Sequence, residues 1–363
     1  MVTYRRVRRA ALCALAALCV LAGSIPAVAA PTTTERARAA ASYLARRQHD
    51  GGAVPGFSKI GSTADAVLSW VAVERGAEQV RDAIRYLKLH HFDATTVGLK
   101  AKLVLALVAA GKDPRAFAGH DFVAEIAATR QSNGRYGATT PVIEHALAIL
   151  ALSAAGEIVP SDPSGWLVAA QCPDGGWQYD APYSSENDDE HCKDRRPGTE
   201  DFFTSDTNTT SYAVQALTVE PTAAAPSFDA FSFFATARDR AYKKGWVYDP
   251  LLKCTAETPP GPDSFCYVSD ANSTSLVLEA YAAAGRDVPT GGRKALGALQ
   301  YRLCGRRAGA VAFTWEDADG DGVLTRTPPD AGASIDAVRG FLLRPLPIAP
   351  TDVDGRLPRR KPC

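Results

Sequence analysis

Two related segments carry the side chains best suited to chemistry. Asp206 begins the run DTNTTS and Asp270 begins the run DANSTS, so an asparagine, Asn208 or Asn272, follows each aspartate by two residues. A carboxyl group held away from water can act as a general acid, and a neighbouring amide can bind a polar ligand group. An aspartate ahead of an apolar helix is also a favoured N-cap. The sequence leaves both roles open.

A second segment, DADGDGVLTRTP at residues 317 to 328, has the spacing of a calcium loop. Its predicted ligands are Asp317, Asp319, Asp321 and the backbone carbonyl of Val323, with Gly322 at the turn. Position 12 is Pro328, where a calcium loop places a bidentate glutamate. Weak calcium binding and a plain turn are therefore both open.

Six cysteines follow an apolar leader, and their spacing predicts disulfides. They are Cys172, Cys192, Cys254, Cys266, Cys304 and Cys363. Neighbours along the chain would pair as 172 with 192, 254 with 266, and 304 with 363, although six cysteines allow fifteen pairings. No Cys-x-x-Cys pair or zinc-type cluster with histidine occurs, which argues against a zinc site.

Residues 1–29 have the features of a secretory signal: four arginines, an apolar run and an A-V-A ending. The apolar run is too short to span a bilayer, so the mature chain has no predicted membrane span. The leader holds four of the 40 Lys and Arg residues, which leaves 36 against 40 Asp and Glu, a formal charge near −4. This balance argues against a nucleic-acid partner. We expect a secreted, extracellular protein.

The segments that must position these side chains repeat along the chain. Amphipathic stretches that end in a glycine turn alternate with more uniformly apolar stretches that open on a small polar residue. The amphipathic stretches cover 38–53, 126–137, 166–180, 237–249 and 293–309, and the apolar ones cover 61–76, 95–114, 140–160, 205–221, 269–289 and 329–345. A helix that is apolar all round is a buried helix. The pattern predicts an inner ring of six helices inside an outer ring.

One copy of the repeat is nearly complete, and it identifies a family. Its residues Trp166, Leu167, Gln171, Gly175 and Trp177 resemble the QW repeat of squalene-hopene cyclases and related terpenoid cyclases. A worn copy keeps Arg38, Ala39, Tyr43, Leu44, Gln48 and Gly51. The resemblance implies the all-α, closed (α/α)6 toroid of the terpenoid cyclase and prenyltransferase superfamily, which is also similar to the cobalamin carriers. It implies a toroid over residues 30–344 and a C-terminal tail over 345–363, with the glutamine and tryptophan joining the ends of adjacent outer helices.

The chemistry of the family is only partly represented. Class II terpenoid cyclases protonate an alkene with an acidic D-x-D-D motif, but Asn208 and Asn272 stand where the middle aspartate would be. An amide is no strong acid, so a cyclase of this kind would need another acid, with Asp65, Asp206 and Asp270 as candidates. The zinc ligand set of the protein prenyltransferases is incomplete, because no histidine follows residue 191.

Alignment of the six apolar stretches suggests a polar ring inside the toroid. The equivalent positions are Asp65, Lys100, His145, Thr210, Thr274 and Ser334. Aromatic residues precede the apolar stretches and would collect at the rim; they are Trp177, Tyr179, Trp246, Tyr248, Tyr267 and Trp315. Aromatic side chains with a few polar groups are typical of a small-molecule pocket. Capping or satisfied core side chains would account for the polar positions equally well.

From the sequence we expect a secreted protein that binds an apolar or amphipathic small molecule at the mouth of the toroid. The resemblance to the carriers makes a corrinoid such as cobalamin the most specific ligand prediction. A separate protein chain or a membrane receptor would have to cover such a ligand. The alternatives are a terpenoid cyclase-like or prenyltransferase-like enzyme acting on an isoprenoid, and a ligand-free scaffold.

Overall fold

The computed structural model describes residues 30–49, 51–137, 141–179, 192, 204–220, 225–262, 264–358 and 363. The chain separates into two units, Met1–Thr32 and Thr33–Cys363. The predicted signal segment, 1–29, lies outside the described residues. The helical fold lies in the unit Thr33–Cys363.

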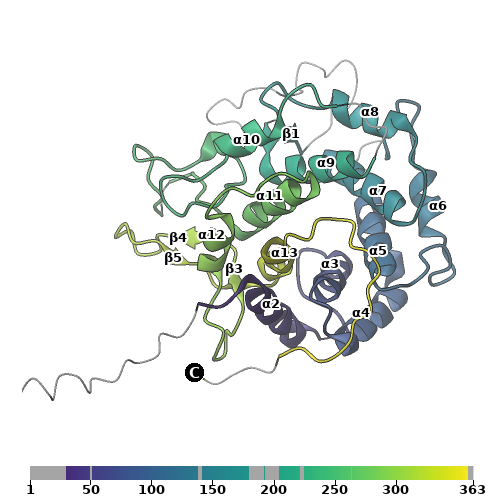
Figure 1. Cartoon of the computed structure of the whole chain (residues 1–363), viewed down its shortest axis with the longest axis horizontal. Helices are drawn as coiled ribbons and strands as arrows, with labels where there is room; N and C mark the ends of the chain where they lie inside the picture. Colours follow the sequence, from purple (N-terminus) through teal and green to yellow (C-terminus); the bar gives the residue numbers. More distant parts are fainter. Residues whose placement is uncertain are drawn as a thin grey trace, which may run out of the picture. The chain divides into compact units, whose positions relative to one another are not determined.

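Six helices form a closed inner ring. They are α3 (Lys59–Ala72), α5 (Val97–Ala109), α7 (Val142–Ala154), α9 (Thr207–Val219), α11 (Ala271–Ala283) and α13 (Ala331–Leu342). Each packs against the next, and α13 packs against α3, so the ring has no free edge (Figure 1). Small polar residues cap five of these helices, four of them at the predicted openers; Ser58 lies ahead of the predicted stretch 61–76, and α7 follows Pro141 without a side-chain cap from the described residues. Ser58, Thr96, Asp206, Asp270 and Asp330 each accept a first-turn N–H.

Six further helices surround this ring. They are α2 (Thr33–Arg47), α4 (Ala77–Leu89), α6 (Phe122–Ala127), α8 (Ser161–Ala169), α10 (Ala230–Thr236) and α12 (Gly292–Leu299). Short 3₁₀ turns follow at η1 (His91–Asp93) and η3 (Pro250–Leu252). The outer helices lie against the inner ones around the ring (Figure 1). The predicted (α/α)6 toroid is therefore the observed fold.

Two expected outer helices are displaced, because the stretch 126–137 lies mostly after α6, which ends at Ala127, and the stretch 237–249 lies after α10. The sequence predicts a helix that begins at residue 237, whereas α10 ends at Thr236 and turns follow it. The Asp239 carboxylate accepts the backbone N–H groups of Tyr242, at 2.9 Å, and Lys243, at 3.0 Å. These local bonds hold the segment in a turn and compete with the helical ladder.

Three glutamines of the repeat, Gln48, Gln171 and Gln300, are clasps between outer helices. Gln171 Nε2 donates to its own turn at Gly175 O, 3.0 Å away, and to Phe228 O, 2.8 Å away, just before α10. Phe228 N donates back to Gln171 Oε1 at 3.0 Å. Gly175 has φ +91°, and a Cβ there would meet Asp229 O at 2.7 Å, so only glycine fits. The tying role that the resemblance implies is confirmed for this glutamine.

Two tryptophans bond to the outer helix of their own repeat and not to the adjacent one. Trp177 Nε1 donates to Leu167 O at 2.7 Å, and Trp246 Nε1 donates to Phe234 O at 2.9 Å. Both indole rings are fully buried. Each therefore fixes a turn against the outer helix that precedes it.

Very short strands hold the starts of three inner helices. β1 (Trp177–Gln178) pairs antiparallel with β2 (Ser205–Asp206), and β3 (Val311–Ala312) pairs with β6 (Pro329–Asp330). A third pair, β4 (Trp315–Glu316) with β5 (Thr325–Arg326), forms a ribbon in the loop before α13. An isolated bridge between Trp246 and Asp270 does the same for α11. The N-terminal ends of α9, α11 and α13 are thereby fixed at one end of the ring.

The C-terminal tail crosses the opposite end of the ring. Leu346 and Ile348 are buried, and Leu346 N donates to Gln215 Oε1 in the second half of α9 at 2.8 Å. Farther along, Gly76 N donates to Gly355 O at 3.2 Å (Figure 1, yellow). The tail therefore covers the C-terminal ends of inner helices and leaves their N-terminal ends as the accessible mouth.

The predicted disulfides all form. Cys172 pairs with Cys192, Cys254 with Cys266, and Cys304 with Cys363, with Cα separations of 4.9 to 5.2 Å. No helix among the described residues is both long enough and apolar enough for a bilayer crossing.

Candidate functional site

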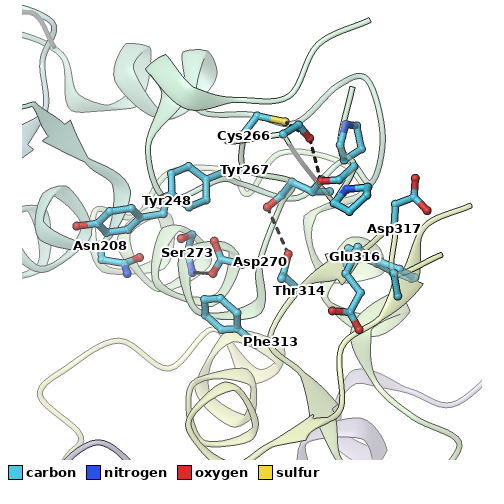
Figure 2. A pocket seen from close by; sticks show the side chains of 17 residues that line it. Asn208, Tyr248, Cys266, Tyr267, Asp270, Ser273, Phe313, Thr314, Glu316 and Asp317 are labelled. Carbon is cyan, nitrogen blue, oxygen red and sulfur yellow. Dashed lines mark hydrogen bonds between the residues drawn. The ribbon is translucent and has the colours of Figure 1, made fainter. Parts of the chain in front are cut away.

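A pocket of about 500 Å³ lies at the mouth of the toroid, at the N-terminal ends of α9 and α11 (Figure 2). We call it the mouth pocket. Its lining includes Asn208, Tyr248, Tyr267, Asp270, Ser273, Phe313 and Trp315, with part of the loop 260–268. Its volume is in the range of pockets that hold drug-sized ligands.

The polar floor of the mouth pocket is built on helix starts. Asp270 is the N-cap of α11, and its Oδ1 accepts Ser273 N at 2.7 Å. In Figure 2, Asp270 and Ser273 lie between the rings of Tyr248 and Phe313. Burial raises the pKa of Asp270 to about 7, although the hydrogen bond from Ser273 lowers it. Desolvation thus outweighs the cap, and this carboxyl exchanges a proton near neutral pH.

The same arrangement recurs one helix earlier. Burial raises the pKa of Asp206 to about 7 against the bond that its Oδ1 accepts from Thr209 N at 2.8 Å. The other oxygen, Oδ2, is buried without a partner among the described residues, as is Asn208 Oδ1. Most buried polar atoms in folded proteins have a hydrogen-bond partner, so these two oxygens are available to accept a further hydrogen bond.

Aromatic side chains form the walls. The rings of Tyr248 and Tyr267 meet edge to face, with centroids 6.1 Å apart. Phe313 is 45% exposed and Tyr267 is 37% exposed, so both present apolar surface to the mouth. Lys243 Nζ lies 4.0 Å from the centre of the Trp315 ring. The pocket therefore combines apolar walls with a polar floor.

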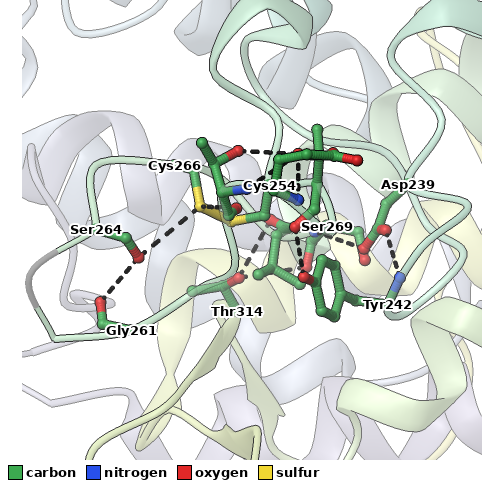
Figure 3. The surroundings of a disulfide bond; sticks show 12 residues. Asp239, Tyr242, Cys254, Gly261, Ser264, Cys266, Ser269 and Thr314 are labelled. Atoms are coloured by element: carbon green, nitrogen blue, oxygen red, sulfur yellow. Dashed lines mark hydrogen bonds between the residues drawn. A yellow bond between two sulfur atoms is a disulfide. The ribbon is translucent and has the colours of Figure 1, made fainter. Parts of the chain in front are cut away.

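A disulfide braces one wall (Figure 3). Cys266 lines the pocket, and its partner Cys254 donates its backbone N–H to Tyr267 O at 3.0 Å. The Tyr242 hydroxyl donates to Thr255 O at 2.6 Å. The loop that carries Gly261 over the pocket is thereby tied at its base.

A charged cluster, which we call the lumen cluster, lies within the ring below the mouth. Its members are Asp65, Lys102, Tyr212, Glu279, Asp336 and Arg339, from α3, α5, α9, α11 and α13. Lys102 Nζ lies 2.6 Å from Asp65 Oδ2. Burial opposes the charge on Lys102, but the Asp65 carboxylate outweighs it and raises the pKa of the amine.

Arg339 and Glu279 of the lumen cluster are almost completely buried. Arg339 Nε donates to Glu279 Oε2 at 3.2 Å, and its NH2 donates to Asp336 Oδ1 at 3.0 Å. Burial raises the pKa of Glu279 to about 8, against the influence of the arginine. Glu279 Oε1 and Arg339 NH1 are buried without partners among the described residues. Sequence reasoning missed Lys102, Glu279, Asp336 and Arg339, whose signal was charge within otherwise apolar helices.

The predicted polar ring does not come together as one set. Thr210, Thr274 and Ser334 each accept the N–H of a clasp turn, from Trp177, Trp246 and Val311, at 2.9 to 3.0 Å. His145 does the same through Nδ1, which accepts Tyr136 N at 3.0 Å, while Nε2 donates to Pro163 O at 3.0 Å. Burial lowers the pKa of His145 to about 4, so the ring is neutral. These side chains join the inner helices to the clasps.

The remaining members of that ring lie apart. Lys100 turns toward α6, where its Nζ lies 2.6 Å from Glu125 Oε2, while Asp65 belongs to the lumen cluster. Of the predicted rim aromatics, Tyr248, Tyr267 and Trp315 line the mouth pocket, as do Asn208 and Asp270. Trp177 and Trp246 are buried clasps, Asn272 Oδ1 is buried without a partner among the described residues, and Tyr179 is 37% exposed outside the pocket lining.

The predicted calcium loop is held by its own backbone. Asp317 Oδ1 accepts Asp321 N at 3.1 Å, and Oδ2 accepts Gly322 N at 3.0 Å. Asp321 Oδ1 accepts Val323 N at 2.8 Å. Among the described residues, which include Asp319, no group of three or more His, Cys, Asp or Glu side chains is placed to hold a metal. Calcium binding here stays a prediction.

No family model matches the chain, and no curated protein matches it either. Solved structures do. A protein from Actinoplanes aligns with a TM-score of 0.52 and 15% identity over 86% of this chain and 98% of its own. A variant of the type II terpene cyclase MstE from Scytonema gives 0.52 and 14% over 86% and 96%.

An α-1,6-mannanase variant, GH76A of Salegentibacter sp. HEL1_6 with bound α-1,6-mannotetrose, gives a TM-score of 0.52 and 11% identity over 86% of this chain and 99% of its own. These structures support the resemblance to terpene cyclases at the level of the fold. They give no support to the resemblance to the cobalamin carriers. Because the sequence identity is low, they establish the fold alone: this chain has the (α/α)6 toroid fold, which a terpene cyclase and a glycoside hydrolase also have.

Proposed function

We propose that this protein binds an apolar or amphipathic small molecule in the mouth pocket. The observation that carries the proposal is the pairing of exposed aromatic walls with Asp270 at a helix start in one cavity of about 500 Å³. The walls would take an apolar body, and the floor would hydrogen-bond a hydroxyl or carbonyl. The three disulfides fit an oxidising compartment, which agrees with the proposed secretion.

The size of the pocket favours a ligand smaller than a corrinoid. A corrinoid macrocycle with its nucleotide tail exceeds a drug-sized molecule and would project from the mouth. Such a ligand would need the covering chain that the sequence analysis anticipated. An isoprenoid alcohol with one polar end fits the arrangement of walls and floor without a second chain.

Farnesol, geranylgeraniol and cobalamin are each titrated into the mature, oxidised protein. Tryptophan fluorescence and native mass spectrometry detect the binding. Phe313→Ala should weaken isoprenoid binding about tenfold, because a large apolar contact of roughly 1.5 kcal/mol or more is lost. Phe265→Ala is the matched control, since Phe265 is 77% exposed near the pocket but does not line it. Equal effects of both variants, or no saturable binding of any probe, would refute the proposal.

A second candidate function is acid catalysis on an isoprenoid. The observation that favours it is the Asp270 pKa of about 7, which keeps much of this carboxyl protonated at neutral pH beside the pocket. Asp206 has a similar pKa but does not line the pocket, and Asp65 is paired with Lys102. Asp270 is therefore the best placed acid of the three.

The two functions are separated by Asp270→Asn, which keeps a cap acceptor but removes the proton. Under acid catalysis, this variant binds geranylgeraniol and forms no cyclic product, whereas the wild type forms one. Under binding alone, neither protein turns over the ligand. Product is detected by mass spectrometry of the extracted lipid.

A further inference from the structure

A second cavity, of about 570 Å³, lies between the end of α2 and the loop that follows α12. Its lining residues are Tyr43, Arg47, Arg306, Arg307 and Pro329. None of them lines the mouth pocket. Three guanidinium groups thus border one cavity whose lining includes no acidic side chain.

This concentration of positive charge is local. The whole sequence has 40 basic and 40 acidic residues, so composition does not explain it. Arg47, Arg306 and Arg307 are exposed, and no carboxylate of the described residues forms an ion pair with them. Asp330, the nearby acid that acts on Tyr43, already caps α13 through Ala333 N at 2.6 Å. Clustered cations without a counterion attract an anion.

The loop that presents two of the arginines is tightly built. Cys304, two residues before Arg306, is joined to Cys363, and Gly305 between them has φ +79°. Gly309 N donates to Arg302 O at 3.1 Å and closes the loop. The Arg307 guanidinium lies 5.3 Å from the centre of the Tyr301 ring. The loop therefore holds Arg306 and Arg307 toward α2 from a braced base.

Tyr43 adds a neutral donor. Burial raises the pKa of its hydroxyl, so the group stays protonated beside the arginines. Among the described residues no acceptor takes this proton in a hydrogen bond. A hydroxyl and three guanidinium groups together match the oxygens of a phosphate group, which guanidinium binds in a bidentate fashion.

We propose that this arginine cavity binds a phosphate-bearing anionic ligand, independently of the mouth pocket. The probe is inorganic pyrophosphate, titrated by calorimetry into the mature, oxidised protein at fixed ionic strength. We expect 1:1 binding. Arg306→Gln with Arg307→Gln should weaken it at least about tenfold, since each removes a charged hydrogen-bond partner. Tyr43→Phe should weaken it less, with the fold unchanged.

Arg293→Gln with Lys294→Gln is the matched control, because both residues are exposed on α12 and lie outside the cavity lining. It removes the same charge and should leave pyrophosphate affinity unchanged. Equal weakening by the two double variants would overturn the proposal, because the attraction would be diffuse. Equal affinity for sulfate would overturn the phosphate assignment. Binding of long-chain polyphosphate without pyrophosphate would contradict a single built cavity.

Discussion

Gln300 and Arg36 join the last outer helix to the first. Gln300 Nε2 donates to Arg36 O at 2.9 Å, and Arg36 NH1 donates to Gln300 Oε1 at 3.2 Å, across 264 residues of sequence. Gln300 Nε2 also donates to its own turn at Gly309 O, at 3.1 Å. The same type of clasp links neighbouring outer helices in other repeats. At Gln300 it joins the last outer helix to the first and so closes the ring.

We predict that Gln300→Ala lowers the free energy of unfolding by about 2 to 4 kcal/mol. The variant leaves the buried Gly309 carbonyl without its side-chain donor and removes the Oε1 acceptor of the part-buried Arg36 guanidinium, and unmet groups of this kind are costly. Urea unfolding followed by circular dichroism measures the change.

Gln131→Ala is the control for this clasp. Gln131 occupies the corresponding place in a worn repeat, but it is exposed and its Nε2 donates only to Thr129 O, two residues away. The expected loss is within about 0.5 kcal/mol. A similar loss in both variants would mean that ring closure adds nothing to stability.

The stability of the fold should decline as the pH rises from 6.5 to 8. Asp206 and Asp270 titrate at about 7 and Glu279 at about 8 in the folded protein, but near 4 when unfolded. The folded state then holds protons that the unfolded state has released, so each group lowers stability by up to about 1.4 kcal/mol per pH unit. His145 acts in the opposite sense, but only between about 4 and 6.5.

Asp206→Asn with Asp270→Asn should flatten the part of this decline near pH 7, because asparagine still caps a helix and does not titrate. Asp121→Asn changes an exposed cap of α6 in the same way and should leave the profile as in the wild type. Chemical denaturation at four pH values gives the comparison. A wild-type stability that rises across this interval would contradict the assigned pKa values.

Local patterning made the ring predictable. Apolar stretches with polar openers become buried helices wherever they can pack against one another, and the repeat supplied six of them. The order of the cysteines along the chain predicted their pairing correctly, because each disulfide joins a cysteine to the next one in the sequence. The outer helix α4 lacked a motif copy and was not identified individually.

The sequence alignment identified Asp65 of the lumen cluster but missed Lys102, Tyr212 and Asp336 through an error of register. The aligned position lies four residues after the N-cap in α5, α9, α11 and α13, whereas Lys102, Tyr212 and Asp336 lie six residues after it. Two residues turn a helix by about 200°, so Lys100 and Lys102 face opposite sides. Which side faces the lumen depends on how the helices pack, and sequence periodicity alone does not state it for a helix that is apolar all round.

Calcium should leave thermal stability unchanged. The Asp317 carboxylate already accepts two backbone N–H groups, and the bidentate glutamate of a calcium loop is replaced by Pro328. We therefore expect the same melting temperature in EDTA and in millimolar calcium. A calcium-dependent increase that Asp319→Asn abolishes would instead establish the site that the sequence suggested.

Removing single disulfides should separate the two cavities. Cys254→Ser with Cys266→Ser frees the loop that lines the mouth pocket, whereas Cys304→Ser with Cys363→Ser frees the loop that presents Arg306. Each change should lower stability by roughly 2 to 4 kcal/mol. We expect the first to weaken geranylgeraniol binding and spare pyrophosphate, and the second to do the reverse.

The two double variants control for a general loss of stability, because each one serves as the reference for the other. Both are measured by calorimetry at a temperature where circular dichroism shows the fold to be intact. If either variant lost both ligands equally, the loops would act through overall stability and not through the cavities they border. If neither lost its own ligand, the braced loops would be unnecessary for binding, and the walls contributed by Tyr248 and Phe313 would have to suffice at the mouth.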